Sequence, residues 1–347
     1  MIYIAIVMFS LAGGVMTFCS SLALRNFSLV LLLAGLGIIF SCRDPYAFPD
    51  YYAYRDIYEQ LSHRSVFSIV NVRDLAFLYF MKIFNWIGVP QDIFFKYQPV
   101  IYYMLLIMGY RIIDNGKYIS FFSFFVLTAA FVFLFHNVIR QGLASIFLLI
   151  SIGLYLRGFS KLSLASAIFS IMSHVTVLPL YFAYLLLMFR VKMVFYLLVL
   201  APFLSVVVFF VLSLESEYLP QKVVNFIAYG YENNLVYARL LMLYSVLVYL
   251  AVSAKKLIYG DLTFRVVYMF SVVVCLMSFL TLPVLLASSR YIYYSSILMP
   301  VLIVYYISMR RDGVNSSLKV LLLTPMVVLF GLLVYSFSSV KTVMGIG

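Results

Sequence analysis

Three arginines stand beside long apolar runs, where a positive charge is costly. Arg140 lies between the uncharged runs Tyr118–Phe135 and Leu143–Leu156, and Arg239 and Arg290 lie near the starts of two later runs. A cation in or near hydrocarbon costs roughly 2.5–3.5 kcal/mol on insertion scales, so such residues usually have a partner or a function. Because a guanidinium donates paired hydrogen bonds to phosphate, these arginines favour a clamp for a lipid pyrophosphate.

The alternative for the arginines is structural. Long cationic side chains can extend to lipid head groups, or they can pair with carboxylates of a neighbouring loop. The carboxylates expected for such pairing are Glu215, Glu217 and Glu232.

Histidine is the second chemically active residue type, and the chain has three: His63, His136 and His174. His174, in Ser173-His174-Val175-Thr176, has the side chain of a general base or of a hydrogen-bond donor to a sugar or phosphate. The alternative is a helix-end histidine bonded to backbone. No two histidines or carboxylates have ligand spacing on one helix, so no metal site is expected.

The segment from Arg43 to Glu59 alternates tyrosines with carboxylates. Tyrosine rings stack on apolar sugar faces while carboxylates bind hydroxyls, so Asp50, Tyr51 and Tyr54 are candidate sugar-binding residues. The alternative is an interfacial helix with a tyrosine belt. The carboxylates that could activate an acceptor hydroxyl here are Asp44, Asp50, Asp56 and Glu59.

The composition indicates a polytopic membrane protein. The chain is 65% hydrophobic and 10% charged with a mean hydropathy of +1.09, whereas soluble domains are about 45–50% apolar. In such a chain the net charge of +12 records topology and does not predict nucleic-acid binding. There is no phosphate-binding loop for ATP and no Gly-x-Ser-x-Gly elbow of a hydrolase, and span interiors lack the acidic residues of a proton-coupled transporter.

Twelve helical spans are expected in a single transmembrane domain over residues 1–347. The two large outer loops are expected at about 42–92 and 214–236, and Leu75–Val89 is expected to be an amphipathic stretch at or in the interface. Two spans are short, and we expect them to be tilted, broken at Pro179 or partly re-entrant. The spans cover about 2–24, 27–42, 93–111, 118–136, 140–156, 162–174, 176–189, 192–213, 236–254, 266–286, 290–309 and 318–340.

Along the chain, hydrophilic segments with a large excess of basic residues alternate with segments in which basic and acidic residues are nearly balanced. One set holds 13 basic and 3 acidic residues and the other 11 and 9, which together make the 24 and 12 of the chain. The positive-inside rule places the first set, which includes Arg111, Lys117 and Arg157, in the cytoplasm. Both termini and the candidate site residues then face outward.

Several segments in order resemble the EpsG-like group of Wzy-type polysaccharide polymerases. They are Pro49-Asp50-Tyr51-Tyr52-Ala53-Tyr54, Arg73-Asp74-Leu75-Ala76-Phe77, Asn137-Val138-Ile139-Arg140-Gln141-Gly142, Ser173-His174-Val175-Thr176 and Ser289-Arg290-Tyr291. By position, Arg140 and Arg290 match the family arginines and His174 matches its histidine. The resemblance implies catalytic roles for these three. The substrate-binding candidates are Arg239, Asp50, Tyr51, Tyr54, His136, Gln141 and Tyr291.

The resemblance implies an all-helical, GT-C-like glycosyltransferase of the bacterial inner membrane that acts without a cofactor or metal. It would join undecaprenyl-pyrophosphate-linked oligosaccharides of O-antigen or capsule on the periplasmic face, among membrane lipids and with a chain-length regulator protein as partner. The alternatives are an O-antigen ligase, which transfers to lipid A core, and a lipid-linked oligosaccharide flippase.

Overall fold

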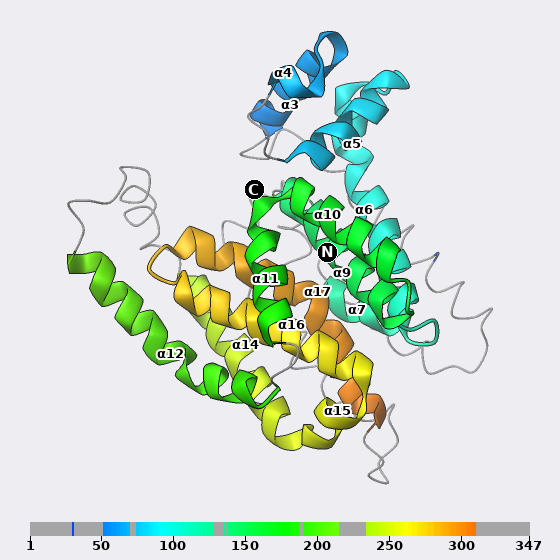
Figure 1. Cartoon of the computed structure of the whole chain (residues 1–347). Coiled ribbons are helices and arrows are strands. Elements are labelled where there is room, and N and C mark those ends of the chain that lie inside the picture. Colours follow the sequence, from blue (N-terminus) through cyan, green and yellow to red (C-terminus); the bar gives the residue numbers. More distant parts are fainter. Residues whose placement is uncertain are drawn as a thin grey trace, which may run out of the picture. The chain divides into compact units, whose positions relative to one another are not determined.

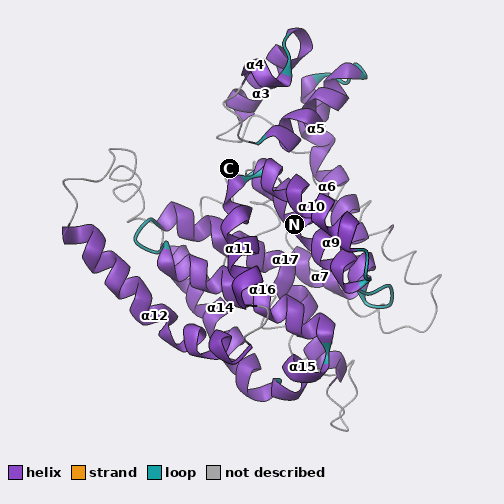
Figure 2. Cartoon of the chain, viewed as in Figure 1, coloured by secondary structure: helices purple, strands orange, loops and turns teal. Residues whose placement is uncertain are grey.

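The computed structural model describes residues 30, 51–69, 74–127, 135, 138–187, 191–214 and 234–309, which form helices joined by loops and turns, without a strand among them (Figure 2). This agrees with the expected all-α class. Apart from residue 30, the predicted spans 2–24, 27–42 and 318–340 lie outside the described residues. The chain divides into two compact units, which are described separately: unit 1 is Met1–Val175 with Ile303–Gly347, and unit 2 is Thr176–Leu302.

Figure 1 labels the described helices, coloured in their order along the chain. Unit 1 contains α3 (Tyr51–His63), α4 (Val66–Ile69), α5 (Leu75–Trp86), α6 (Gln91–Ile113), α7 (Tyr118–Leu127), α9 (Ile139–Leu156) and α10 (Ser160–Ser173). Unit 2 contains α11 (Leu178–Leu187), α12 (Val191–Leu214), α14 (Asn234–Ser253), α15 (Lys255–Gly260) and α16 (Leu262–Leu280). The last helix, α17 (Leu285–Met309), begins in unit 2 and ends in unit 1.

Four helical segments of the described chain are long and apolar enough to cross a membrane: Ile139–Leu156, Val236–Ser253, Leu262–Leu280 and Ala287–Ser308. They coincide with four of the predicted spans, and α6 and α12 cover two more. The expected short spans are the 14-residue α10 and the 10-residue α11. The two helices are separated at His174–Val177, where the predicted spans also divide. Pro179 does not break α11, because it lies in the first turn, where its missing N–H costs no helical hydrogen bond. The full count of twelve stays a prediction.

Helices α9 and α10 pack side by side and antiparallel through serines. Ser170 Oγ donates to Ala144 O at 2.6 Å near the start of α9. Ser163 Oγ donates to Ser151 O at 2.8 Å near its end. Small polar side chains let membrane helices approach closely and satisfy their own hydroxyls on the partner backbone. The start of α9 and the end of α10 therefore lie at one end of the pair.

Glycines allow α6 to approach the opposite side of α9. A Cβ at Gly153 would lie 2.9 Å from Ile112 Cγ2, and one at Gly109 would lie 3.0 Å from Leu149 Cδ2. Both contacts are too short for a methyl group, so each helix presents its glycine to a branched side chain of the other.

Helices α3 and α5 form the described part of the first predicted outer loop. In α3, Tyr54, Tyr58 and Leu61 lie at i, i+4 and i+7 and are buried. Tyr58 stacks on Phe94 of α6 at 5.1 Å and donates to Val89 O at 2.7 Å. Burial of this ring raises the pKa of Tyr58 to about 12. The amphipathic α3 is thus anchored on α6.

The predicted amphipathic stretch forms α5. One face buries Ala76, Phe77 and Met81, and the other exposes Ile83 and Trp86. An exposed tryptophan and isoleucine on a short helix are typical of an interfacial helix, and its place at the membrane surface stays a prediction.

In unit 2, α16 is the central helix, and α11, α12, α14 and α15 contact it. The ring of Tyr184 in α11 stacks on Phe270 of α16 with centroids 3.9 Å apart. Ser288 Oγ of α17 donates to Ser278 O of α16 at 2.9 Å. The start of α17, which carries Arg290, is thereby fixed against the end of α16.

At the far end of α6, Asp114 joins three parts of unit 1. Its carboxylate accepts from Lys117 Nζ at 2.9 Å, Tyr305 OH of α17 at 3.0 Å and Gly116 N at 2.7 Å. Burial alone would raise the pKa of Asp114, but these donors and the nearby ammonium outweigh it and lower the pKa. The last turn of α17 is thus bound to the α6–α7 connection.

Gly153→Ala should destabilise the protein by about 1–3 kcal/mol because the new methyl group meets Ile112. Helix propensity alone would favour alanine by roughly 1 kcal/mol. The midpoint of thermal unfolding of the detergent-solubilised protein measures the effect. Gly260→Ala is the control, since a Cβ there has no atom within 4 Å, and it should be neutral or stabilising. Equal midpoints for the two variants would contradict the close approach.

Asp114→Asn should lower thermal stability at neutral pH, and the deficit should shrink in acid. The pKa of Asp114 is lower in the folded state, so its contribution is complete above the unfolded value near 3.9 and is lost as the pH falls through the folded value. The difference in unfolding midpoint between wild type and variant should hold from about pH 7 to about pH 5 and decline below about pH 4. Asp56→Asn, on the exposed face of α3, should leave the midpoint unchanged at neutral pH.

Candidate functional site

Arg140 lies in the first turn of α9 and is held from two directions. Its Nε donates to Tyr54 OH at 2.9 Å, and its Nη1 pairs with Asp74 Oδ2 at 2.5 Å. The guanidinium also lies over the Tyr54 ring, 5.4 Å from the centroid. The side chain keeps 38% of its surface exposed. Among the described residues Nη2 has no partner, so the cation is oriented and still accessible.

Asp74 reaches this arginine by an unusual backbone conformation. It is the N-cap of α5, but its φ of 68° and ψ of 27° are left-handed and its side chain does not cap its own helix. Among residues other than glycine, only asparagine, aspartate and histidine adopt this region with any frequency. The carboxylate, which usually caps a helix from this position, is directed to Arg140.

The first turn of α9 is itself electropositive. Its N-cap, Val138, makes no side-chain capping hydrogen bond, and the N-terminal end of a helix carries a partial positive charge. Tyr102 OH of α6 donates to Ile139 O at 3.1 Å, which fixes the position of this turn. Arg140 therefore adds a full charge to a site that already favours anions.

The candidate base, His174, lies at the same end of the helix pair as Arg140. It follows the last residue of α10, its backbone N–H donates to Ser170 O at 3.1 Å, and its side chain is buried. Since Ser170 bonds to Ala144, one turn beyond Arg140, the antiparallel packing brings the two residues to one end. Helix α5, whose N-cap is Asp74, also contacts α10.

Tyr54 is placed differently from a sugar-binding platform. Its ring is 6% exposed and packs edge-on against Phe77 of α5, with centroids 5.6 Å apart, beneath Arg140. The segment forms a helix, as the alternative of an interfacial helix with a tyrosine belt requires, but Tyr54 and Tyr58 are buried while Tyr52 is exposed. The Tyr54 hydroxyl oxygen accepts the hydrogen bond from Arg140 Nε.

Unit 2 contains the other two arginines. Arg239 in α14 lies over the ring of Tyr293 in α17, 5.9 Å from its centroid. Arg290 lies one turn before Tyr294, whose hydroxyl is 2.8 Å from Thr176 Oγ1. Tyr291 is 7% exposed. These contacts bring the starts of α14 and α17 together within unit 2, so Arg239 and Arg290 belong to one end of this unit.

The remaining candidates are distributed more widely. Asp44, Asp50, His136 and the glutamates expected as arginine partners lie outside the described residues, as does the side chain of Tyr51. Gln141 is fully buried in α9. On α3, Asp56 is exposed and Glu59 pairs with Arg55 at 3.3 Å.

The residue that sequence reasoning missed is Asp74 as the partner of Arg140. The two are 66 positions apart. The signal in the sequence pointed elsewhere: an aspartate directly before an apolar amphipathic helix is a favoured N-cap, but the Asp74 side chain does not cap α5. Within the described part of the chain, no group of three His, Cys, Asp or Glu side chains is placed to hold a metal ion.

Comparison with models of known protein families identifies the family of this chain. The profile of the EpsG family matches residues 27–345, nearly the whole chain. The chain therefore belongs to the EpsG family, which confirms the resemblance seen in its ordered segments. No curated protein and no solved structure matches it, so the GT-C-like arrangement stays a prediction.

The effects of Arg140→Gln and Asp74→Asn on the free energy of unfolding should not be additive. Each single change leaves a partly buried charge without its partner and should cost about 1–2 kcal/mol. The double variant should be more stable than the sum of the single effects by about 1 kcal/mol. Asparagine also tolerates the left-handed backbone, so the change tests the charge alone. The measurement is a double-mutant cycle of unfolding midpoints.

The matched control is the exposed pair Arg55 and Glu59, for which a cycle of Arg55→Gln and Glu59→Gln should give coupling of about 0.5 kcal/mol or less. Additive effects at Arg140 and Asp74 would show that their ion pair contributes nothing to folding.

Proposed function

We propose that this EpsG-family membrane protein is a glycosyltransferase that polymerises oligosaccharide repeat units carried on undecaprenyl pyrophosphate. The reaction takes place on the periplasmic face of the bacterial inner membrane and releases undecaprenyl pyrophosphate. Support comes from the family match over residues 27–345, from the helices long enough to cross a membrane, and from the cationic residues at one end of each unit.

The observation that carries the proposal is the geometry of Arg140. A cation that served only to anchor a helix end would need no fixed orientation. Here Tyr54 and Asp74 hold Nε and Nη1, while Nη2 and the exposed part of the guanidinium remain for a ligand. Preorganised donors in a site of low dielectric stabilise developing negative charge without reorganising during the reaction.

The chemistry is a displacement at the anomeric carbon of the donor sugar. The oxygen of an acceptor hydroxyl forms the new glycosidic bond to that carbon, and the bond from the carbon to the pyrophosphate oxygen breaks. The bonding electron pair leaves with the pyrophosphate, and the hydroxyl proton passes to a base. Negative charge therefore grows on the leaving oxygen, and we assign Arg140 and Arg290 to that oxygen and its phosphates, with Arg239 as an additional contact.

His174 is our assignment for the base. Its place at the end of α10, beside the start of α9, puts an imidazole at the same end as Arg140, and histidine exchanges protons near neutral pH. Glu59, one of the carboxylates considered as a base, already has a cationic partner in Arg55. Asp74, the carboxylate nearest to Arg140, is likewise paired with that arginine.

In this proposal the arginines provide the charge stabilisation, and no metal ion is invoked. Tyr54 and Asp74 are positioning residues, because they contact the guanidinium and not the reacting atoms. Membrane lipids surround the helices, and a separate chain-length regulator protein sets the number of repeat units joined.

The test uses a strain that lacks its own polymerase and expresses Arg140→Ala, Arg290→Ala or His174→Ala. Each change should abolish long-chain polysaccharide and leave surface glycan with one capped repeat unit, since loss of one transition-state contact costs about 3 kcal/mol, a roughly hundredfold loss of rate. A gel of surface glycan, with membrane levels of the protein measured in parallel, gives the result. Complete loss of the capped unit would indicate a ligase, and repeat units trapped on the cytoplasmic face would indicate a flippase.

The controls separate chemistry from folding. Arg55→Ala and His63→Ala remove side chains of the same types from α3 and should leave chain length unchanged. Asp74→Asn disturbs the same ion pair but keeps the cation, so it should retain more polymer than Arg140→Ala. Normal chain lengths in Arg140→Ala would overturn the proposal.

A further inference from the structure

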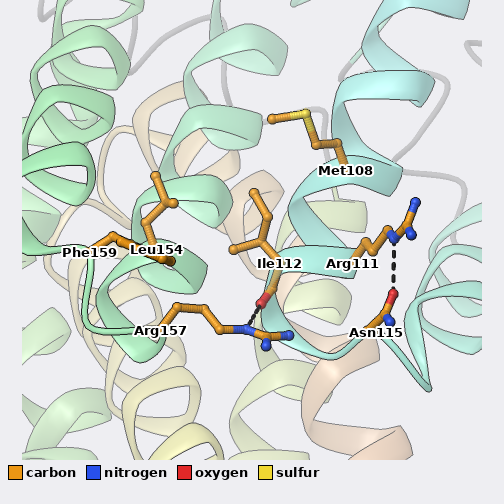
Figure 3. Close-up of a pocket in the computed structure, with 7 residues that line it drawn as sticks. All are labelled: Met108, Arg111, Ile112, Asn115, Leu154, Arg157 and Phe159. Atoms are coloured by element: carbon orange, nitrogen blue, oxygen red, sulfur yellow. Dashed lines mark hydrogen bonds between the residues drawn. The ribbon is translucent and has the colours of Figure 1, made fainter.

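A pocket of about 420 Å³ lies between the ends of α6 and α9 that are opposite to Arg140 (Figure 3). Ligand sites commonly enclose about 300–1,000 Å³. The pocket lies entirely within unit 1 and outside the candidate site. Its apolar lining is Met108, Ile112, Leu154 and Phe159, and its polar lining is Arg111, Asn115 and Arg157.

Both arginines of the pocket are anchored by one nitrogen only. Arg157 Nε donates to Ile112 O at 2.8 Å, and Arg111 Nε donates to Asn115 Oδ1 at 2.9 Å, as the dashed lines in Figure 3 show. Within the described residues, the terminal Nη groups of both make no hydrogen bond or ion pair. Each guanidinium is therefore directed by its Nε and keeps its paired terminal donors for an acceptor.

The nearest acid in sequence does not neutralise these arginines. Asp114 is occupied by Lys117, Tyr305 and the backbone N–H of Gly116. No carboxylate lines the pocket among the residues that the structure describes. The two arginines thus form a cationic site without a protein anion.

Apolar surface continues from the pocket along α6. Met104 and Met108 are 60% and 51% exposed and lie one turn apart, and Arg111 follows almost one turn later on the same face. Phe159, on the α9 side, is 56% exposed. A basic group at the end of an exposed apolar stripe is complementary to an anionic lipid, because the cation can bind the charged head group while the stripe contacts the hydrocarbon chain.

We propose that this pocket binds an anionic phospholipid of the inner leaflet. The terminal nitrogens of Arg111 and Arg157 donate to the lipid phosphate, and an acyl chain lies along Met108 and Met104. The charge distribution assigns this end of unit 1 to the cytoplasm, where the leaflet is rich in anionic lipids and basic pockets between helices bind their head groups. The proposal concerns a different site from the polymerase reaction and does not depend on it.

A purely structural role would be capping of helix C-termini, for which arginine is suited. The Arg157 bond to Ile112 O is such a cap, and it uses one donor of the guanidinium. Capping predicts that the arginines stabilise the protein equally in any detergent or lipid. Lipid binding predicts stabilisation that depends on the head group and saturates.

The experiment titrates the purified full-length chain in detergent with phosphatidylglycerol and follows its unfolding midpoint. The midpoint should rise and saturate with phosphatidylglycerol, because a ligand that binds only the folded state stabilises it. Phosphatidylcholine with the same acyl chains and inorganic phosphate should each have little effect. Arg111→Ala combined with Arg157→Ala should raise the half-saturating lipid concentration about tenfold or more.

Two further variants keep the result interpretable. Lys161→Ala removes an exposed charge from the same end outside the pocket and should titrate like wild type. Met108→Glu leaves the anchored arginines in place and adds a carboxylate to the pocket, so it should also lose the lipid response. An equal response to phosphatidylcholine, a response to inorganic phosphate alone, or an unchanged titration in both pocket variants would each overturn the proposal.

Discussion

The cation of Arg140 is the constraint on which the end of unit 1 that holds α3, α5 and the start of α9 depends. A guanidinium at the start of a membrane-length helix needs acceptors, and α9 supplies none from its own N-cap. Tyr54 and Asp74 arrive from two helices that precede α6. This requires α3 to turn its tyrosine face inward and Asp74 to adopt a left-handed backbone. The orientation of α3 and α5, the described part of the first predicted outer loop, therefore follows from the need of the Arg140 guanidinium for hydrogen-bond acceptors.

Helix α9 links this end to the rest of the unit. Its 18 residues span about 27 Å, serines fix it to α10, and glycines admit α6 on its other side. Because both contacts are close and directional, α9 cannot slide without breaking hydrogen bonds or creating clashes. The positions of Arg140 and Arg157 at opposite ends are therefore fixed together.

Periodicity and charge predicted much of this arrangement. The helical class, the short pair before and after His174, and the amphipathic stretch at Leu75 follow from apolar runs and their interruptions. The division between the spans 162–174 and 176–189 agrees with the structure, whereas the alternative of a break at Pro179 does not, because a proline is an equally good signal for a break and for the first turn of a helix.

The contact between Asp74 and Arg140 could not be predicted in this way. A single sequence carries no information on which distant carboxylate meets which cation, and here 66 residues separate them. Glutamates in the other predicted outer loop were equally plausible partners by charge alone. Only the packing of α3, α5 and α10 selects Asp74, and that packing depends on side-chain shapes that periodicity does not specify.

Asp114 and Asp74, two carboxylates of unit 1, hold their cations in different settings. Asp114 receives hydrogen bonds from its own turn and from Tyr305, and it holds a cation only three residues away. Its charge is largely satisfied by nearby protein groups, and it organises a connection. Asp74 instead turns from its own helix to orient an arginine that keeps 38% of its side-chain surface exposed. Burying this guanidinium fully would add a desolvation penalty that its ion pair need not offset, so the arrangement fixes the orientation of the cation and leaves part of it accessible.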